Sequence, residues 1–296
     1  MRNIAFIGVG AMGAPIAHRL IEAGCALTVC DARPAAATAF AQRARLAPSP
    51  AACAGAELVF VLVASDAQVQ AVLLGPDGLL AAVDPAAPPC VVVMSTVHPD
   101  TLQALVGPLA AKNASLLDAP ISGGIDGATS GKLSVMVGGS SDDFARVRPV
   151  LDLIGSRVTL CGALGAGMKT KILNNLIGVA NWLLTAETMA LGVRMGLDLD
   201  SLAATMEQGS GRNIATGNWA SRKALYGRYA LDDKLFESNN EICRKDLSLV
   251  LALAASGSIE LPLTRGLARL LDDTPWRELH AAWSALAPQD TVAHRP

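Results

Sequence analysis

The sequence predicts an α/β protein whose first part forms a doubly wound, mainly parallel sheet and whose second part is all helical. Short apolar runs alternate with helical segments in the first part, whereas from residue 172 onward we find helical periodicity and turn residues but no convincing strand. The chain is 51% hydrophobic but only 4% aromatic. Its core must therefore be built mainly from Ala, Leu and Val, which suits parallel strands packed against helices.

The first apolar run, Ile4 to Ile7, ends in Gly8-Val9-Gly10-Ala11-Met12-Gly13 and is followed by a segment of helical composition. A G-x-G-x-x-G sequence between a strand and a helix is the Rossmann motif, in which the helix N-terminus binds a pyrophosphate. Gly8 permits the tight turn, Gly10 lets the phosphates reach the backbone, and Gly13 lets helix and strand pack closely. All six residues, Ala11 and Met12 included, are therefore candidate cofactor contacts.

The next predicted strand, Ala26 to Cys30, ends at Asp31, where an acidic residue can accept hydrogen bonds from a ribose diol. A carboxylate at this position repels a 2′-phosphate and so favours NAD over NADP. Arg33 weakens that preference because a guanidinium can bind the phosphate. The expected cofactor is therefore NAD, with NADP left open.

Two further strands extend the parallel sheet. Leu58 to Val63 is expected to be a buried strand, and Val91 to Met94 a second one that ends in Ser95-Thr96. Ligands of doubly wound sheets bind at the carboxyl ends of the strands, so Thr96 is a candidate contact to the nicotinamide end of the cofactor. The alternative is that Thr96 caps the helix that follows Pro99.

A glycine-rich connection, Ser122-Gly123-Gly124, lies between predicted strands at Leu116 to Asp118 and Leu133 to Gly139. Consecutive glycines expose backbone N–H groups that can hold a carboxylate, to which Ser122 adds a hydroxyl. The alternative is a hairpin-like connection whose glycines only satisfy turn geometry. A helix from Phe144 to Leu153 and a strand from Val158 to Leu160 are expected to complete this part.

The segment from Gly162 to Asn175 leads from a glycine-rich turn into a long apolar helix, expected from Ile172 to Val193. On one helix Lys171 and Asn175 share a face with Gly178 and Trp182, whereas Lys169 lies about 200° away. An ammonium beside an amide suits a substrate with an oxygen to protonate and a carboxylate to hold. The alternative is an ordinary lysine on a partly solvated helix face.

The simplest organisation has two domains, a dinucleotide-binding domain over residues 1–162 and an all-helical domain for substrate and oligomerisation over residues 163–296. In the helical part, Lys245 stands four residues after Glu241 and just before an apolar stripe. The pattern alone makes Lys245 a surface residue. The tail from Gln289 is expected to be loosely ordered.

Charge and cysteine usage argue against several classes of partner. The 24 Lys and Arg balance 26 Asp and Glu to a net charge of -2 without long runs of one sign, so neither nucleic acid nor a membrane is expected as a partner. The six cysteines and four histidines form no CxxC pair and no metal-ligand spacing. We therefore expect reduced thiols and no metal. The first strand begins within four residues, which predicts a cytoplasmic protein without a secretory signal.

Taken in order, four motifs resemble those of the β-hydroxyacid dehydrogenase family. They are Gly8 through Pro15, Asp118-Ala119-Pro120-Ile121-Ser122-Gly123-Gly124, Gly162 through Asn175, and Lys245-Asp246-Leu247. The resemblance covers nearly the whole chain. It implies that Lys171 is the general acid/base, that Asn175 binds substrate, and that Ser122, Gly123 and Gly124 hold the substrate carboxylate. It also implies that Thr96 lies near the nicotinamide, that Lys245 reaches the cofactor, and that the protein is a homodimer or homotetramer.

Two departures from the family pattern leave the substrate open. Met94 stands where many relatives carry an acidic residue, and the segment from Phe236 to Asn240 does not match one subgroup. The resemblance implies hydride transfer between a small hydroxy acid and NAD(P). A lysine acting as base needs a pKa below its usual 10.4 or so, and the possible causes are Lys245, the nicotinamide ring and the helix N-terminus near Gly165.

Two other functions stay open at this point. An imine reductase-like enzyme would share the architecture, although such enzymes usually lack a lysine at the position of Lys171. A dinucleotide-binding sensor without catalysis would need neither Lys171 nor Asn175. Which hydroxy acid is used, and in which direction, does not follow from the sequence.

Overall fold

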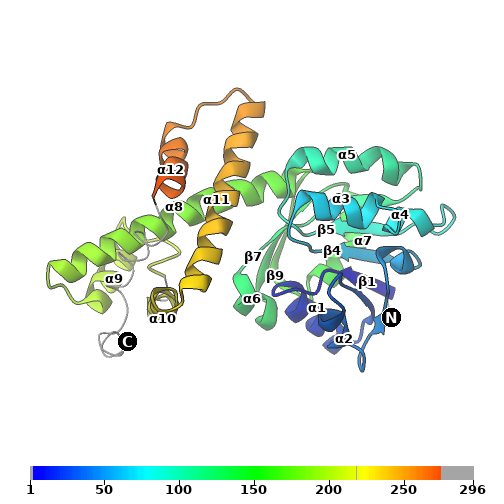
Figure 1. The fold of residues 1–296 in the computed structure, drawn as a ribbon, viewed down its shortest axis with the longest axis horizontal. Helices are drawn as coiled ribbons and strands as arrows, with labels where there is room; N and C mark the ends of the chain where they lie inside the picture. The colour runs from blue at the N-terminus through cyan, green and yellow to red at the C-terminus, as the bar shows by residue number, and fades with distance from the viewer. Residues whose placement is uncertain (1–2, 218, 275–296) are drawn as a thin grey trace. The chain divides into compact units, whose positions relative to one another are not determined.

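The computed structural model describes residues 3–217 and 219–274. The chain forms two compact units, Met1–Lys171 and Ile172–Pro296, which are considered separately (Figure 1). The boundary lies inside the long helix α8 (Ala166–Arg194), later in the chain than residue 162. The predicted loose tail from Gln289 is outside the described residues.

The described part of the first unit contains one nine-stranded sheet in the order β3-β2-β1-β4-β5-β6-β8-β7, with β9 paired to β8. Neighbours from β3 to β6 are all parallel, whereas β8 is antiparallel to β6 and β7. The strands are β1 (Asn3–Ile7), β2 (Ala26–Cys30), β3 (Arg45–Leu46), β4 (Leu58–Val61), β5 (Cys90–Val93), β6 (Ser115–Asp118), β7 (Ile121–Ser122), β8 (Leu133–Gly138) and β9 (Gly155–Gly162). The predicted doubly wound, mainly parallel sheet is therefore confirmed.

Helices cover both faces of this sheet, with α3, α4 and α5 on one side and α1 and α6 on the other (Figure 1). The helical elements are α1 (Gly13–Glu22), α2 (Pro34–Thr38), a 3₁₀ turn η1 (Pro50–Cys53), α3 (Asp66–Leu74), α4 (Leu79–Ala82), α5 (Pro99–Ala110), α6 (Gly124–Ser130) and α7 (Ser141–Leu151). The strands β4 and β5 are buried along their whole length. This double burial is why they consist of continuous runs of Val, Leu and Phe.

Chain order reverses between β1 and β4, so the connections that leave the carboxyl ends of these two parallel strands run in opposite directions along the sheet. In doubly wound sheets this switch point is where ligands bind. The loop after β1 carries the glycine motif, and the segment after β5 carries Thr96. Both predicted cofactor elements therefore lie at the carboxyl edge of the sheet.

The described residues of the second unit form helices joined by irregular segments and contain no strand, as predicted. Its helices are α8, α9 (Leu199–Gln208), α10 (Trp219–Leu231), α11 (Asp233–Ser256) and α12 (Pro262–Asp273). The aromatic ring of Trp182 stacks on Tyr226 at 4.4 Å and meets Tyr229 edge-on at 5.4 Å. With Phe236 and Leu247, these rings form part of a separate core.

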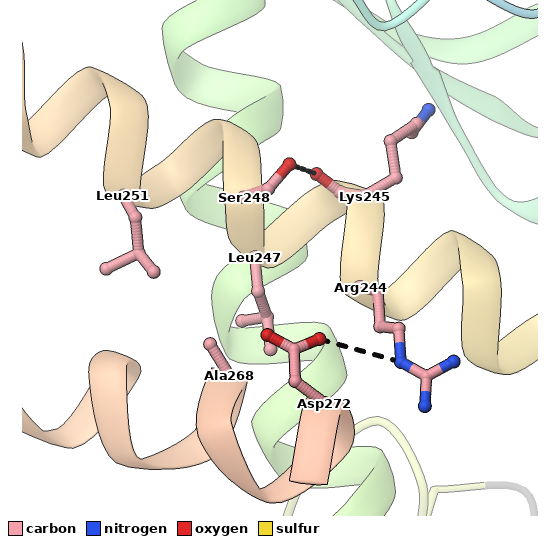
Figure 2. A pocket seen from close by; sticks show the side chains of 7 residues that line it. All are labelled: Arg244, Lys245, Leu247, Ser248, Leu251, Ala268 and Asp272. Atoms are coloured by element: carbon pink, nitrogen blue, oxygen red, sulfur yellow. Dashed lines mark hydrogen bonds and ion pairs between the residues drawn. The ribbon is translucent and has the colours of Figure 1, made fainter. Parts of the chain in front are cut away.

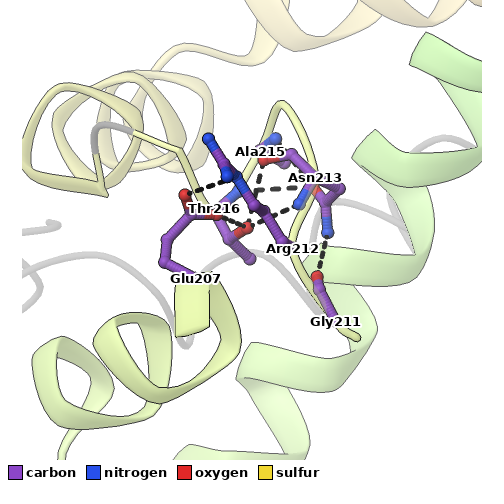
Figure 3. Close-up of polar contacts among 6 residues, drawn as sticks. All are labelled: Glu207, Gly211, Arg212, Asn213, Ala215 and Thr216. Carbon is purple, nitrogen blue, oxygen red and sulfur yellow. Dashed lines mark hydrogen bonds and ion pairs between the residues drawn. The ribbon is translucent and has the colours of Figure 1, made fainter. Parts of the chain in front are cut away.

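The segment between α9 and α10 contains Gly209, Gly211 and Gly217 and is fixed by a cluster of polar contacts (Figure 3). The side-chain oxygen Oδ1 of Asn213 accepts hydrogen bonds from the Ala215 and Thr216 backbone N–H groups. Thr216 is fully buried, and its hydroxyl donates to Glu207 at 2.5 Å. Arg212 pairs with the other carboxylate oxygen of Glu207. These contacts give an irregular segment one defined conformation.

By length and composition alone, helix α8 could cross a membrane, since the mean hydropathy of its most apolar part is 1.4. Its side chains Val179, Leu183, Ala186 and Met189 are, however, buried in the core of the helical unit. The same helix also carries Asn174, Asn175 and Glu187. These features are typical of the core helix of a globular domain.

Candidate active site

The glycine loop after β1 is shaped by close contacts that only glycine allows. Gly8 has φ +98°, and a Cβ there would lie 2.2 Å from the carbonyl oxygen of Leu62. A Cβ on Gly13 would lie 2.0 Å from the carbonyl oxygen of Gly8. At Gly10 the nearest atom to such a Cβ is an Arg33 guanidinium nitrogen at 3.4 Å. The loop is thus packed tightly at Gly8 and Gly13 but bordered at Gly10 only by a flexible cation.

Asp31 anchors this loop from the end of β2. One carboxylate oxygen accepts from the Val9 backbone N–H at 2.9 Å, and the other accepts from the Arg33 N–H at 2.8 Å and pairs with its guanidinium at 3.3 Å. Burial acts to raise the pKa of Asp31, but the hydrogen bonds from Arg33 and Val9 outweigh it and lower the pKa below its usual value. Asp31 is therefore ionised at neutral pH.

The residues of the loop fit a bound dinucleotide. Met12 is the N-cap of α1, and its side chain makes no capping bond within the described residues, while the first turn of the helix has no acidic side chain. The positive end of α1 is therefore left for an external anion, and the Gly10 position leaves the backbone approachable. The carboxylate of Asp31 beside the same loop suits a ribose diol.

Thr96 lies between two residues with structural contacts. Ser95 is buried and its hydroxyl accepts from the Val63 N–H at 2.7 Å, while the Val97 N–H contacts the Met168 sulfur at 3.4 Å. The side chain that caps α5 is His98, whose ring nitrogen accepts from the Asp100 N–H. The capping alternative for Thr96 is therefore wrong, because the helix begins at Pro99 and its cap is the residue directly before.

Ser122 ends the short strand β7, and Gly123 and Gly124 lead directly into α6. The two glycines have φ +132° and +64°, which other residues rarely adopt. A Cβ on Gly124 would have no neighbour within 4 Å, whereas one on Gly123 would contact Leu133 at 3.2 Å. Helix α6 thus connects the antiparallel strands β7 and β8, in place of a tight hairpin turn.

Helix α8 begins at Ala166, so Lys171 lies in its second turn. The Lys171 side chain is buried, with 8% of its surface exposed, whereas Lys169 is exposed. This difference agrees with the prediction that the two lysines point to opposite sides of the helix. The helix also begins earlier than the predicted Ile172, because its first turn is fixed by a residue far away in the sequence.

That residue is Asp118, which lies in the predicted substrate motif. Its fully buried carboxylate accepts hydrogen bonds from the Gly165 N–H at 2.7 Å and the Met168 N–H at 2.5 Å. Burial raises the pKa of Asp118, and these hydrogen bonds and the charge of Lys169 oppose that rise. The helix N-terminus near Gly165 is therefore occupied by a carboxylate. The positive helix end, one of the three possible causes of a lowered lysine pKa, is thus compensated by this carboxylate.

Asn175, the predicted substrate ligand, is held by another acidic residue. Its side-chain N–H donates to a carboxylate oxygen of Asp246 at 2.7 Å, and its side-chain oxygen Oδ1 accepts from the side-chain N–H of Asn174 at 3.3 Å. Asp246 is buried. The motif Lys245-Asp246-Leu247 drew attention to the lysine, but the aspartate is the residue that contacts Asn175.

Lys245 lies on the exposed side of α11, with its ammonium 3.8 Å from Asp246. Its neighbour Arg244 is directed toward Asp272 of α12, while Lys245 points away from α12 (Figure 2). A cavity of about 270 Å³ lies between α11 and α12 and is lined by Arg244, Lys245, Leu247, Ser248, Leu251, Ala268 and Asp272. It contains none of the predicted substrate residues.

All six cysteines lie within the described residues, and all are free thiols. Four of them are buried, as predicted for reduced core residues. The Cys30 and Cys53 side chains are hydrogen-bonded to each other, and this bond together with burial raises the pKa of Cys53 strongly. The same hydrogen bond lowers the pKa of Cys30 below its usual value, so the two thiols are shifted in opposite directions.

Fold and glycine loop together define a dinucleotide-binding protein with a helical second domain. A family model described as the NAD binding domain of 6-phosphogluconate dehydrogenase matches residues 3–190. A second, the NAD-binding domain of NADP-dependent 3-hydroxyisobutyrate dehydrogenase, matches residues 165–283. The chain belongs to the β-hydroxyacid dehydrogenase family and is an NAD(P)-dependent oxidoreductase.

Individual proteins agree with this assignment. The 3-hydroxyisobutyrate dehydrogenase of Pseudomonas aeruginosa is 38% identical, covering 89% of each chain. The solved structure of 3-hydroxyisobutyrate dehydrogenase with L-serine from Mycobacterium tuberculosis has a TM-score of 0.78 and 28% identity, covering 97% of this chain and 98% of that one. An imine reductase from Pseudomonas sp. gives a TM-score of 0.59 at 18% identity, covering 96% and 99%. That last similarity shows the fold alone.

Proposed function

We propose that this protein transfers a hydride between NAD(P) and the hydroxyl-bearing carbon of a small 3-hydroxy acid or a related hydroxy acid, with Lys171 as general acid/base. The observation that carries the proposal is the position of Lys171. It is a buried amine in the second turn of a helix whose first turn is hydrogen-bonded to the end of β6. An amine on a largely buried residue, carried by a helix that is hydrogen-bonded to the sheet, is suited to exchanging one proton with a bound substrate.

The proposed reaction divides the work between cofactor and protein. Bound NAD(P) supplies the hydride acceptor or donor at C4 of its nicotinamide ring. In the oxidative direction Lys171 accepts the hydroxyl proton as the C–H bond breaks and the carbonyl forms, and in the reductive direction it returns a proton to the carbonyl oxygen. Ser122, Gly123 and Gly124 hold the carboxylate, and Asn175 binds the substrate from α8.

Cofactor contacts are proposed for the glycine loop, Asp31, Thr96 and Lys245. The ionised Asp31 supports a preference for NAD, because its charge would repel a 2′-phosphate. Arg33 forms an ion pair with Asp31 and borders Gly10, so it is the group that would accept NADP. We expect NAD to be used with the higher kcat/KM.

Substrate size is inferred from the relatives. One is named a 3-hydroxyisobutyrate dehydrogenase, and the solved structure of another contains L-serine. Both molecules carry a carboxylate and a hydroxyl on the carbon two bonds away from it. We propose that this protein acts on hydroxy acids of three or four carbons with that arrangement.

A spectrophotometric panel tests the proposal. Purified protein is given three- and four-carbon hydroxy acids with NAD and with NADP, and formation of the reduced cofactor is followed. We expect turnover of at least one acid, and Lys171→Ala should lower kcat by about 10² to 10⁴ with little change in cofactor affinity. Lys169→Ala, on the opposite side of the same turn, is the matched control and should stay within about threefold of wild type.

The same panel separates the other candidate functions. Cofactor binding without turnover of any acid would favour a sensor, and turnover of cyclic imines in place of acids would favour an imine reductase. Activity of Lys171→Ala within about tenfold of wild type would contradict the role of Lys171 even if the enzyme oxidises hydroxy acids.

We further propose that copies of this chain associate through α8. Leu173, Ile177, Leu184 and Leu191 are each more than half exposed. Their spacing puts them within about 40° of one another around the helix, so they form one apolar stripe. Such a stripe is typical of a surface that a second helix covers.

Light scattering after gel filtration tests this association. Wild-type protein should have the mass of a dimer or tetramer, and Ile177→Asp with Leu184→Asp should reduce it to that of a monomer. Leu263→Asp is the control, because Leu263 is 90% exposed on α12, outside the stripe. A wild-type monomer, or a double variant that keeps its mass, would contradict the proposal.

A further inference from the structure

We propose that Asp118 is the positioning residue for Lys171: its buried carboxylate holds the first turn of α8 against the end of β6 and thereby fixes where the lysine stands. This inference rests on the proposed role of Lys171. Asp118 does not act on the substrate in this scheme. It acts through the helix that carries the lysine.

The hydrogen bonds of Asp118 define the start of α8. The Gly165 N–H belongs to the residue just before the helix, and the Met168 N–H belongs to its third residue. Both groups would otherwise lack a helical partner. Capping side chains usually come from the helix itself or from the residue before it, whereas Asp118 is 47 residues away in sequence. The contact therefore caps the first turn of α8 and also joins the helix to the sheet.

Neighbouring glycines allow this close approach. Gly138 pairs with Asp118 across β6 and β8, and a Cβ on it would lie 2.3 Å from one carboxylate oxygen. A Cβ on Gly167 would lie 2.2 Å from the carbonyl oxygen of Met136 and 2.9 Å from the other carboxylate oxygen. The space around the carboxylate is thus closed on two sides by backbone. A fully buried group in such a space has little freedom to move.

Met168 connects the anchor to the rest of the site. Its N–H donates to Asp118, and its sulfur accepts from the Val97 N–H, directly after Thr96. Lys171 follows three residues later and lies on the same side of the helix as Met168. Both side chains are buried. The end of β5, the end of β6 and the first turns of α8 are therefore held in one arrangement.

Charge gives Asp118 a second effect on the lysine. Its carboxylate lies at the positive end of α8, and the charge of Lys169 opposes the rise that burial causes in its pKa. Removing the negative charge should favour the neutral form of an amine nearby on the same helix. A change at Asp118 should therefore alter the pH dependence of turnover as well as its rate.

Asp118→Asn tests the proposal. The amide keeps the shape of the carboxylate but presents an N–H to one of two backbone N–H groups, so one hydrogen bond is lost. We expect kcat to fall about 10- to 100-fold while the Kd for the cofactor stays within about threefold. We also expect the limb of the oxidative pH-rate profile that reports the base to move to lower pH by about 0.5.

Asp198→Asn is the matched control, since Asp198 caps α9 through the Ser201 N–H in the other unit. It makes the same chemical change at a helix start and should leave the pH-rate profile unmoved. If kcat of Asp118→Asn stays within about twofold of wild type and the limb of its pH-rate profile does not move, the proposal is overturned. An equal fall in kcat for both variants would overturn it too, because that would reflect general loss of stability.

If Asp118→Asn does not fold, hydrogen exchange of the wild-type protein tests whether Asp118 holds the first turn of α8. The amides of Gly165 and Met168 should exchange as slowly as those of β5, and exchange as fast as at an exposed helix start would overturn the anchor. The role of Lys171 is judged separately. An inactive Lys171→Ala beside a fully active Asp118→Asn contradicts only the role of Asp118, whereas an active Lys171→Ala contradicts the proposed function.

Discussion

Two helices in the first unit begin after a glycine-rich turn, and they differ in whether a protein carboxylate accepts hydrogen bonds from their N-terminal N–H groups. At α1, after Gly8 to Gly13, no described side chain caps the helix and the first turn has no acid. At α8, after Gly162 to Gly165, the buried carboxylate of Asp118 accepts two of these hydrogen bonds. The positive end of α1 is left for a ligand, whereas that of α8 is neutralised by the protein.

This difference separates binding from positioning. A helix start that binds a phosphate must stay approachable, and its glycines keep side chains away from the anion. A helix start that holds a catalytic side chain gains from an internal anion, because the hydrogen bonds fix the first turn. A glycine-rich turn before a helix does not by itself reveal which of the two uses it serves.

Giving α1 its own carboxylate should have the largest effect. Met12→Asp places an acid at the N-cap, where it should stabilise the helix by about 1 kcal/mol. The same charge about 5 Å from a pyrophosphate should cost about 3 kcal/mol of binding at an effective dielectric constant of about 20. Isothermal titration should therefore show a Kd for NADH raised by about 100-fold or more, at an unchanged or higher melting temperature.

Met12→Asn is the control for this experiment. It offers a similar cap without the charge and removes the same apolar contacts, so it should keep the Kd for NADH within about fivefold of wild type. Equal weakening by Asp and Asn would show that packing of Met12, and not the open positive end of α1, determines cofactor affinity.

The local sequence predicts the start of α1 but not that of α8. The loop before α1 is predictable because its glycine motif lies within six consecutive residues. The predicted start of α8 is too late, because the alanine and glycine residues before Ile172 have no apolar periodicity and the cap comes from Asp118. Asp246 was missed as the partner of Asn175 for the same reason, since 71 residues separate them.

The sheet shows the same limit. Buried strands such as β4 were predicted because double burial demands a continuous apolar run. Strand β9 extends from Gly155 to Gly162, well beyond the predicted Val158 to Leu160, because it is half exposed and only its centre is apolar. Pairing with β8 defines the length of β9, and this pairing cannot be predicted from the residues of β9 alone.

Gly167→Ala should sharpen the comparison with an intermediate effect. Alanine normally stabilises a helix by about 1 kcal/mol over glycine. Here its Cβ would lie 2.2 Å from the Met136 carbonyl oxygen, so the first turn of α8 must move. We expect a net loss of about 1–3 kcal/mol in the free energy of unfolding and a fall in kcat of about tenfold.

Gly107→Ala is the matched variant, because Gly107 lies inside α5 and a Cβ there would have no neighbour within 4 Å. It should be as stable as wild type or more so, with unchanged kcat. Urea denaturation and steady-state kinetics of both variants decide the matter. If Gly167→Ala proves as stable and active as Gly107→Ala, close packing at the start of α8 is not required.

The smallest expected effect concerns the two carboxylates themselves, because their pKa values are shifted in opposite directions. Burial opposes but does not outweigh the hydrogen bonds to Asp31, so its pKa is lowered, whereas burial raises the pKa of Asp118. A lowered pKa gives stability that is present above the unfolded-state value of about 3.9 and is lost as pH falls through the folded value. A raised pKa gives stability that is full below about 3.9 and is lost as pH rises through the folded value.

Unfolding by urea over a range of about pH 3 to about pH 7 can therefore tell the two environments apart. The difference in unfolding free energy between wild type and Asp31→Asn should grow as the pH rises. For Asp118→Asn the difference should shrink, because ionised Asp118 contributes less to stability than the protonated form does. If the difference in unfolding free energy changes with pH in the same direction for both variants, then Asp31 beside α1 and Asp118 at α8 do not differ in how their carboxylates are solvated.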